Sequence, residues 1–283
     1  MLGFINVYKR VGDTSAYVVN QVKKIFKCKC GHMGTLDPLA SGVLPVALGQ
    51  ASRLFSYMVD KEKTYIATFD FSYTTPSLDL ETEPSARSEK SVSVEDVERV
   101  LPEFIGEISQ VPPAYSAKCV DGTKSYKLAR RGKEVELKPK TVLIKNVEII
   151  KNLGDNKFCF QIECNGGTYI RALCRDIANA LGVYGVMTSL ERVKSGEFEK
   201  EKSVTLDELR SADDHSKYLI RAEDVIHYDR IDLDDESATR ILNGLCEGYS
   251  FPDGVFKAYA FNSFWGIMKV DGGNVDVTYI RDL

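Results

Sequence analysis

The segment from Gly31 to Pro45 limits the possible folds of this chain more than any other. It reads GHMGTLDPLASGVLP and so holds three glycines and two prolines in fifteen residues. Glycine allows backbone conformations that other residues avoid, and proline lacks a hydrogen-bond donor, so this composition predicts a tightly folded loop. Pro38 favours an extended backbone at Asp37, which fixes the direction of one carboxylate. An isolated Asp-Pro pair is usually a simple turn, but the glycines permit close approach of a ligand and favour a functional loop.

The spacing of apolar residues elsewhere predicts both strands and helices. Helices are expected after Ser15, from Ser93 and over Thr168–Leu181, where Gly182 closes the last one. Strands are expected at 3–8, 61–73, 141–150 and 157–164. Since strands and helices do not alternate strictly, the pattern favours an α+β fold over a doubly wound one.

The charge of the chain is unevenly distributed. The 283 residues carry a formal net charge of −4, so the chain as a whole lacks the basic surplus that is typical of nucleic-acid-binding proteins. Residues 118–145, however, hold nine basic and three acidic side chains, whereas residues 207–236 hold eleven acidic and four basic ones. The acidic run, interpreted as a solvated surface, therefore hides a local basic region that could contact phosphates. A domain boundary is expected near residue 228, followed by a small β-rich module.

The chain shows neither a targeting signal nor a membrane span. The first ten residues have no basic region before an apolar stretch, and no run approaches the roughly 18 apolar residues that a span needs. Seven cysteines are scattered along the chain and are expected to be reduced thiols. We therefore expect a cytoplasmic protein.

Several short motifs occur in an order that resembles a known family. The Gly31–Leu44 loop resembles the catalytic loop of the TruB-type tRNA pseudouridine-55 synthases, and the other motifs follow the family's order over about residues 3–200. They are Asn6–Lys9 with Gly12-x-Thr14-Ser15, Lys63-x-Tyr65, Val111–Lys118, Gly167–Arg171 and Leu190-x-Arg192. Two departures are visible: Arg10 replaces the usual proline, and the pattern is degraded over Thr74–Asp79.

The resemblance implies a fold and a domain organisation. The expected fold is a pseudouridine synthase fold, in which a mixed, largely antiparallel sheet is flanked by helices and loops. The catalytic domain would cover 1–228 and include a basic thumb-like insertion at about 113–141. Residues 229–283 would form a short PUA-like RNA-binding module, although this tail is shorter than a full PUA barrel.

The resemblance also implies an activity. The expected protein isomerises a uridine in the T-loop of tRNA to pseudouridine, as a monomer and without a cofactor, after the base is flipped out of the RNA. Asp37 matches the catalytic carboxylate, and Arg171 matches the arginine that pairs with it and keeps it charged. Direct attack on C1′ and removal of the 2′ proton both remain open as the role of Asp37.

Further residues match positions that contact RNA. Tyr65 matches the tyrosine that stacks on the base, while Tyr169 and Leu190 match pocket positions; without the resemblance, each would be interpreted as a core residue. His32 matches the residue that fills the space left by the flipped base. Lys9 matches a basic residue that supports the catalytic loop. The expected RNA-contacting basic residues are Lys9, Lys118, Lys124, Arg130, Arg131 and Lys133, and Asp79 is expected to be structural.

The sequence also allows two other interpretations, a zinc site and a tRNA-binding module without activity. Cys28-x-Cys30-x-His32 offers three zinc ligands, but a structural zinc site needs a fourth, and no second cysteine or histidine pair is present. The chain has no glycine-rich phosphate-binding motif, so the sequence does not imply a nucleotide cofactor. The second hypothesis for function is a tRNA-binding or remodelling module with a degenerate active site, which the intact Asp37, Tyr65 and Arg171 disfavour.

Overall fold

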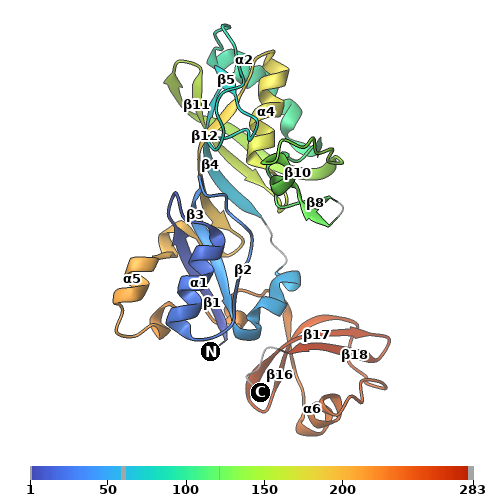
Figure 1. The fold of residues 1–283 in the computed structure, drawn as a ribbon. Coiled ribbons are helices and arrows are strands. Elements are labelled where there is room, and N and C mark those ends of the chain that lie inside the picture. The colour runs from blue at the N-terminus through green and yellow to red at the C-terminus, as the bar shows by residue number, and fades with distance from the viewer. Residues whose placement is uncertain (1, 59–61, 121, 280–283) are drawn as a thin grey trace.

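A large mixed sheet forms the centre of the molecule in the computed structural model, which describes residues 2–58, 62–120 and 122–279 (Figure 1). Eight strands form its main path, and neighbours run antiparallel except for the pairs β14–β1 and β3–β12. In spatial order they are β14 (Val204–Thr205), β1 (Gly3–Lys9), β3 (Ser41–Leu48), β12 (Val186–Ser195), β4 (Lys63–Asp70), β11 (Lys157–Cys164), β10 (Lys140–Gly154) and β7 (Gly106–Gln110). Two short strands join off this path: β2 (Cys30–His32) pairs with β3, and β13 (Phe198–Glu199) pairs with β12.

Helices cover this sheet at both of its ends (Figure 1). They are α1 (Ser15–Phe26), α2 (Val94–Val100), α4 (Ile170–Leu181) and α5 (Leu206–Ser211), with 3-10 turns at Gly49–Tyr57, Leu101–Phe104, Lys200–Lys202, Ser216–Tyr218 and Ala222–Asp224. Their ends follow local chemistry: the Thr14 side chain caps α1, Ser93 and Asp96 form a capping box on α2, and Gly182 ends α4 in the left-handed conformation. The apolar faces of α1 and α4 pack into the main core, where Val22, Leu173 and Ile177 are fully buried.

A second, smaller sheet lies at the C-terminal end of the chain. It contains β15 (Asp229–Asp232), β16 (Gly254–Ala260), β17 (Ser263–Asp271) and β18 (Asn274–Tyr279), and α6 (Asp235–Leu242) precedes β16. This sheet has its own core, in which Trp265 and Met268 are buried. The expected module over 229–283 extends beyond residue 279, the last one described.

Short elements lie beside the upper part of the large sheet. A small hairpin consists of β5 (Tyr73–Thr74) and β6 (Ala86–Arg87). The segment over about 113–141, which is expected to be a thumb-like insertion and is called so below, carries β8 (Cys119–Val120), β9 (Thr123–Lys124) and the single-turn α3 (Ser125–Ala129). No helix in the described ranges is long and apolar enough to cross a membrane.

The α+β fold class is confirmed, with one correction to the expected loop. The predicted loop over Gly31–Pro45 is shorter, because β2 includes its first two residues and β3 begins at Ser41. Pro45 fits inside β3 although it has no N–H, and its carbonyl oxygen accepts a hydrogen bond from Met33 N at 2.9 Å. The loop proper therefore covers residues 33–40. The strand expected from residue 61 begins at Lys63, and residue 61 lies outside the described ranges.

Candidate functional site

The loop over residues 33–40, called the Asp37 loop below, is held by hydrogen bonds at several points. Ser15 Oγ donates to the Leu36 carbonyl oxygen and accepts from Leu36 N, both at 2.9 Å. The N–H of Gly12 donates to the Pro38 carbonyl oxygen at 2.8 Å, and Ala40 N donates to the Asp37 carbonyl oxygen at 3.0 Å. The segment before α1 and the first turn of α1 thus fix the position from which the Asp37 side chain extends.

Asp37 forms an ion pair with Arg171, as the family resemblance implies. Arg171 Nη2 lies 2.8 Å from Asp37 Oδ2, although the two residues are 134 positions apart in the chain. Arg171 is the second residue of α4, so the start of this helix places the guanidinium. The exposed fraction of the side chain is 4% for Arg171 and 37% for Asp37, so the carboxylate is the more accessible of the two groups.

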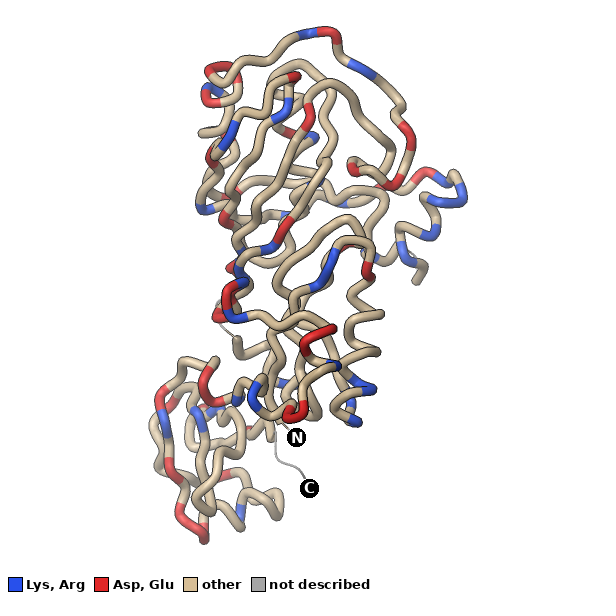
Figure 2. Tube along the Cα trace, turned by 90° about the vertical axis from the view of Figure 1, so that its left-hand side faces the viewer, with Lys and Arg blue, Asp and Glu red and all other residues tan. Residues whose placement is uncertain are grey.

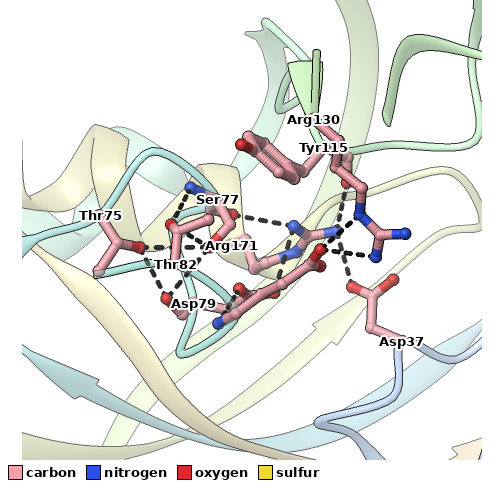
Figure 3. A network of polar contacts seen from close by, with 9 residues as sticks. Asp37, Thr75, Ser77, Asp79, Thr82, Tyr115, Arg130 and Arg171 are labelled. Carbon is pink, nitrogen blue, oxygen red and sulfur yellow. Dashed lines mark hydrogen bonds and ion pairs between the residues drawn. The ribbon is translucent and has the colours of Figure 1, made fainter. Parts of the chain in front are cut away.

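The same guanidinium contacts a second carboxylate and two backbone carbonyls (Figure 3). Arg171 Nη1 lies 3.3 Å from Asp79 Oδ2 and donates to the Ser77 carbonyl oxygen at 2.9 Å. Arg171 Nη2 also donates to the Tyr115 carbonyl oxygen at 2.9 Å. A buried cation is stable only when such acceptors replace water. The orientation of Arg171 towards Asp37 is therefore fixed before any substrate binds.

A cavity of about 280 Å³ opens beside Asp37. Tyr65 from β4, Leu190 from β12 and Tyr169 before α4 line it together with Asp37 and Arg171. The sheet explains part of this arrangement, because Leu190 on β12 pairs with Ala67 on β4, one position along the same face from Tyr65. The structure therefore brings together the predicted residues Asp37, Arg171, Tyr65, Tyr169 and Leu190.

Burial changes the proton affinity of the groups in this cavity. It raises the pKa of the Asp37 carboxyl, and the Arg171 charge is the strongest effect in the opposite direction. Burial also raises the pKa of the Tyr65 hydroxyl to about 12, so this group is protonated at neutral pH. The pKa of Tyr169 is raised by burial as well. The cavity therefore combines one carboxylate with two neutral phenols.

Lys9 does not have the RNA-contacting position that the sequence predicts. Its side chain is fully buried, and Nζ donates to the carbonyl oxygens of Asp13 at 2.7 Å, Arg10 at 3.0 Å and Pro38 at 3.5 Å. Burial lowers its pKa to about 8. Lys9 therefore supports the Asp37 loop from inside the protein, and its RNA contact is a wrong expectation because no surface is left for it.

His32 lies apart from the cavity. It ends β2, is exposed, and is not among the residues that line the space beside Asp37. Desolvation lowers its pKa, and the positive charge of Arg192 acts in the same direction. His32 is therefore a neutral ring at the surface of the strand that leads into the Asp37 loop.

The predicted basic residues of the thumb-like insertion are exposed. Figure 2 shows Lys and Arg interspersed with Asp and Glu over most of the chain, and a run of basic residues on a segment that projects from the upper part. Arg130 Nη2 forms an ion pair with Glu81 Oε1 at 2.6 Å. Glu81 lies two residues after Asp79 in the chain. Lys124 Nζ donates to the Ala117 carbonyl oxygen at 3.1 Å. Lys118, Arg131 and Lys133 are also exposed on this insertion.

Two groups at the site, Gln110 and Arg192, were given no role from the sequence. Asp79, which was expected to be structural, shares the Arg171 guanidinium with Asp37. Gln110 Oε1 accepts a hydrogen bond from Tyr169 N at 2.8 Å and so holds the start of α4. Arg192, noted only as part of a motif, is fully buried beneath the Asp37 loop. Such contacts join distant segments, and no local pattern in the sequence indicates them.

The zinc alternative finds no support in the geometry. Cys28 Sγ and Cys30 Sγ lie 3.9 Å apart, but within the described ranges no three histidine, cysteine or acidic side chains converge in a way that could hold a metal ion. Burial raises the pKa of the Cys30 thiol to about 12, so it is a protonated thiol at neutral pH.

Comparison with known families identifies the family to which the chain belongs. Residues 23–170 match the TruB family pseudouridylate synthase N-terminal domain, and residues 171–225 match the tRNA pseudouridylate synthase B C-terminal domain. Among curated proteins, tRNA pseudouridine synthase B of Clostridium novyi is 39% identical over 247 residues, which cover 87% of this chain and 85% of that protein. The protein of the same name from Caldanaerobacter subterraneus is 37% identical and covers 96% of both chains.

Solved structures agree with these matches. A crystal structure of a Cbf5-Nop10-Gar1 complex has a TM-score of 0.71 and 26% identity, and covers 97% of this chain and 83% of that chain. That of the archaeal box H/ACA sRNP Nop10-Cbf5 complex has a TM-score of 0.70 and 25% identity, and covers 98% of this chain and 85% of that chain. The fold and its cavity thus define a pseudouridine synthase. More narrowly, the chain belongs to the TruB family of pseudouridylate synthases.

Proposed function

We propose that this chain converts one uridine in the T-loop of tRNA, position 55, to pseudouridine, with Asp37 as the catalytic carboxylate. The observation that carries the proposal is the Asp37–Arg171 ion pair of 2.8 Å at the edge of a cavity lined by Tyr65, Tyr169 and Leu190. The substrate follows from relatives named tRNA pseudouridine synthase B that align over 85% or more of their own length. The catalytic domain is assigned to residues 1–228 and a PUA-like module to 229–283.

The reaction places simple demands on the site. The C1′–N1 bond of the uridine breaks, the uracil turns and C1′ joins C5. C5 then loses its proton and N1 gains one, so the product is an isomer of the substrate and no electrons are gained or lost. Asp37 acts beside the ribose either by attacking C1′ or by removing the 2′ proton. Arg171 keeps its carboxylate ionised, because the guanidinium opposes the rise in pKa that burial causes. Tyr65 and Leu190 form the apolar walls that hold the detached base during its rotation.

Access to the cavity requires the uridine to leave its stacked position. Extruding a base from an RNA loop costs a few kcal/mol, which protein contacts must offset. His32 is exposed on β2 and would occupy the vacated space as a neutral ring. The thumb-like insertion would hold the RNA backbone through Lys118, Lys124, Arg130, Arg131 and Lys133. One chain carries all of these groups, so a monomer is sufficient.

A mapping experiment tests this proposal. The protein is incubated with an unmodified tRNA transcript and with one in which the T-loop uridine is replaced by cytidine, and pseudouridine is located at single-nucleotide resolution. We expect one pseudouridine, in the T-loop of the first transcript and absent from the second. A T-stem-loop fragment should be modified as well. Tight tRNA binding without pseudouridine would favour the alternative, a tRNA-binding module.

A further inference from the structure

Arg192 is a buried cation whose surroundings differ from those of Arg171. It is fully buried and is one of the largest side chains in the interior. Arg171 forms ion pairs with two aspartates, whereas none of the ion pairs among the described residues includes Arg192. Burying a charge is costly unless hydrogen bonds replace its water. The position of Arg192 is therefore decided by the backbone carbonyls that accept its protons.

These carbonyls flank the Asp37 loop, one near its start and the other in β3 just after it. Arg192 Nη2 donates to the Gly34 carbonyl oxygen at 3.0 Å, at the start of the loop. Its Nε donates to the Val43 carbonyl oxygen at 2.8 Å, three residues after the loop ends. Gly34 has a φ of +119°, a conformation that favours glycine. The backbone therefore turns at the residue whose carbonyl oxygen accepts the hydrogen bond from Arg192. One rigid guanidinium thus joins the entry and the exit of the loop.

The sheet register places the same side chain next to Tyr65. Arg192 on β12 pairs with Gly42 on β3 and with Tyr65 on β4, so it lies in line with both across three adjacent strands. A Cβ atom at Gly42 would come within 2.2 Å of the Arg192 carbonyl oxygen, so only glycine allows this approach. The guanidinium also interacts with the Tyr65 hydroxyl and opposes the rise in pKa that burial causes there.

We propose that Arg192 is a positioning residue that holds the Asp37 loop and the Tyr65 hydroxyl in one fixed geometry, and thereby sets the rate of the bound tRNA's reaction and not the affinity for tRNA. The expected effect on the rate rests on the proposed function. Arg192 does not line the cavity and acts only through the Asp37 loop and Tyr65. Lysine in its place keeps the charge, but its single ammonium group cannot span both carbonyls and the hydroxyl.

The test compares Arg192→Lys with a matched core variant, Val147→Ala. Val147 is buried on β10 and lies outside the cavity, so its truncation lowers stability without touching the loop. For Arg192→Lys we expect the single-turnover rate of pseudouridine formation to fall roughly 10- to 100-fold, as for a small misplacement of reacting groups, with tRNA Kd within about twofold. Val147→Ala should keep the wild-type rate at a similar loss of Tm.

A second measurement does not depend on activity. Amide hydrogen exchange of the peptide that covers residues 33–40 should become at least about tenfold faster in Arg192→Lys and stay unchanged in Val147→Ala, because opening of this loop no longer has to break the two carbonyl contacts. Unchanged exchange in a folded Arg192→Lys protein would overturn the inference. A wild-type protein that binds tRNA without modifying it would instead refute the proposed function, and the exchange result would still decide the role of Arg192.

Coupling to Tyr65 is tested by a double-mutant cycle. Tyr65→Phe removes only the hydroxyl, so in this background Arg192→Lys should lower the rate less than it does alone. Fully additive losses, a rate within twofold of wild type, or a loss seen only in Kd would each contradict the proposal. Should Arg192→Lys fail to fold, Arg192→Gln, which keeps one donor group without the charge, is measured in the same way.

Discussion

The cavity around Arg171 and the thumb-like insertion are neighbours that are built in opposite ways. Arg171 is 4% exposed and draws its partners Asp37, Ser77, Asp79 and Tyr115 from three separate stretches of the chain. Arg130 in the insertion is 58% exposed and has an ion pair with Glu81, next to a helix of one turn. Groups that react must be held in place before substrate arrives, whereas groups that grip a backbone can adapt to it. We therefore expect the two regions to control different quantities, the reaction rate and the affinity for tRNA.

Loss of the Asp37 charge should give the largest effect. Asp37→Asn keeps the size of the side chain but removes the carboxylate, so pseudouridine formation should fall by about 10⁴-fold or more, while tRNA Kd changes less than about threefold. Burial raises the pKa of Asp37 in the folded protein, so this group favours folding at low pH and loses that effect as the pH rises through its folded pKa. At neutral pH the variant should thus melt at or above the wild-type Tm. Single-turnover kinetics, filter binding and thermal unfolding measure the three quantities.

A weaker partner for Asp37 should give the next largest effect. Arg171→Lys cannot hold both aspartates and both carbonyls, so the rate should fall by about 10²- to 10³-fold. Because the guanidinium opposes the rise in the pKa of Asp37, its replacement should move the acid limb of the rate profile to higher pH. The pH dependence of the single-turnover rate measures this shift, and a profile that moves to lower pH would contradict the proposed role of Arg171.

Charge reversal in the thumb-like insertion should act on affinity. Arg130→Glu combined with Arg131→Glu should raise tRNA Kd by about tenfold and flatten its salt dependence, since each lost phosphate contact removes about 0.7–0.9 from the slope. The rate at saturating protein should stay within about threefold of wild type. Lys151→Glu, an exposed charge reversal on β10, is the control for a charge reversal outside the insertion. An unchanged slope in the double variant would remove the insertion from the RNA interface.

Release of Arg130 from its ion pair should slightly strengthen tRNA binding, the opposite of the charge reversal. Glu81→Gln removes the ion pair of 2.6 Å and leaves Arg130 free to contact phosphate. Exposed ion pairs contribute at most about 1 kcal/mol, so tRNA Kd should decrease by about twofold with no change in rate. Weaker binding in this variant would indicate that the ion pair positions the insertion for RNA.

Chelation should have no effect at all. Cys28 and Cys30 lie close together, but the described residues offer no complete set of metal ligands. The rate after treatment with a strong chelator should therefore equal the untreated rate. A loss of activity that zinc restores would reverse the interpretation of these cysteines.

The sequence predicted the elements that depend on local chemistry. The beginnings of α1 and α2 near Ser15 and at Ser93, and the left-handed end of α4 at Gly182, follow from residues a few positions apart. The family motifs predicted the lining residues of the cavity for the same reason, since each motif is continuous in the chain.

Contacts between distant segments could not be predicted in this way. The burial of Lys9 depends on how β1 packs beneath the Asp37 loop, and the two carbonyls that hold Arg192 belong to residues about 150 positions earlier. The strand β12 was missed as well, because its polar and apolar residues do not alternate cleanly and its pairing with β4 contains two register shifts. Such features are decided by tertiary packing and not by local pattern.

One experiment tests the division between rate and affinity most directly. Single-turnover rates and tRNA Kd values are measured on the same unmodified transcript for the wild type, for Asp37→Asn, and for Arg130→Glu combined with Arg131→Glu. We predict that Asp37→Asn loses the rate and keeps the affinity, and that the double variant loses affinity and keeps the rate at saturation. The account would be contradicted if Asp37→Asn still formed pseudouridine at a comparable rate, or if the double variant lost its rate at saturation as completely as Asp37→Asn does.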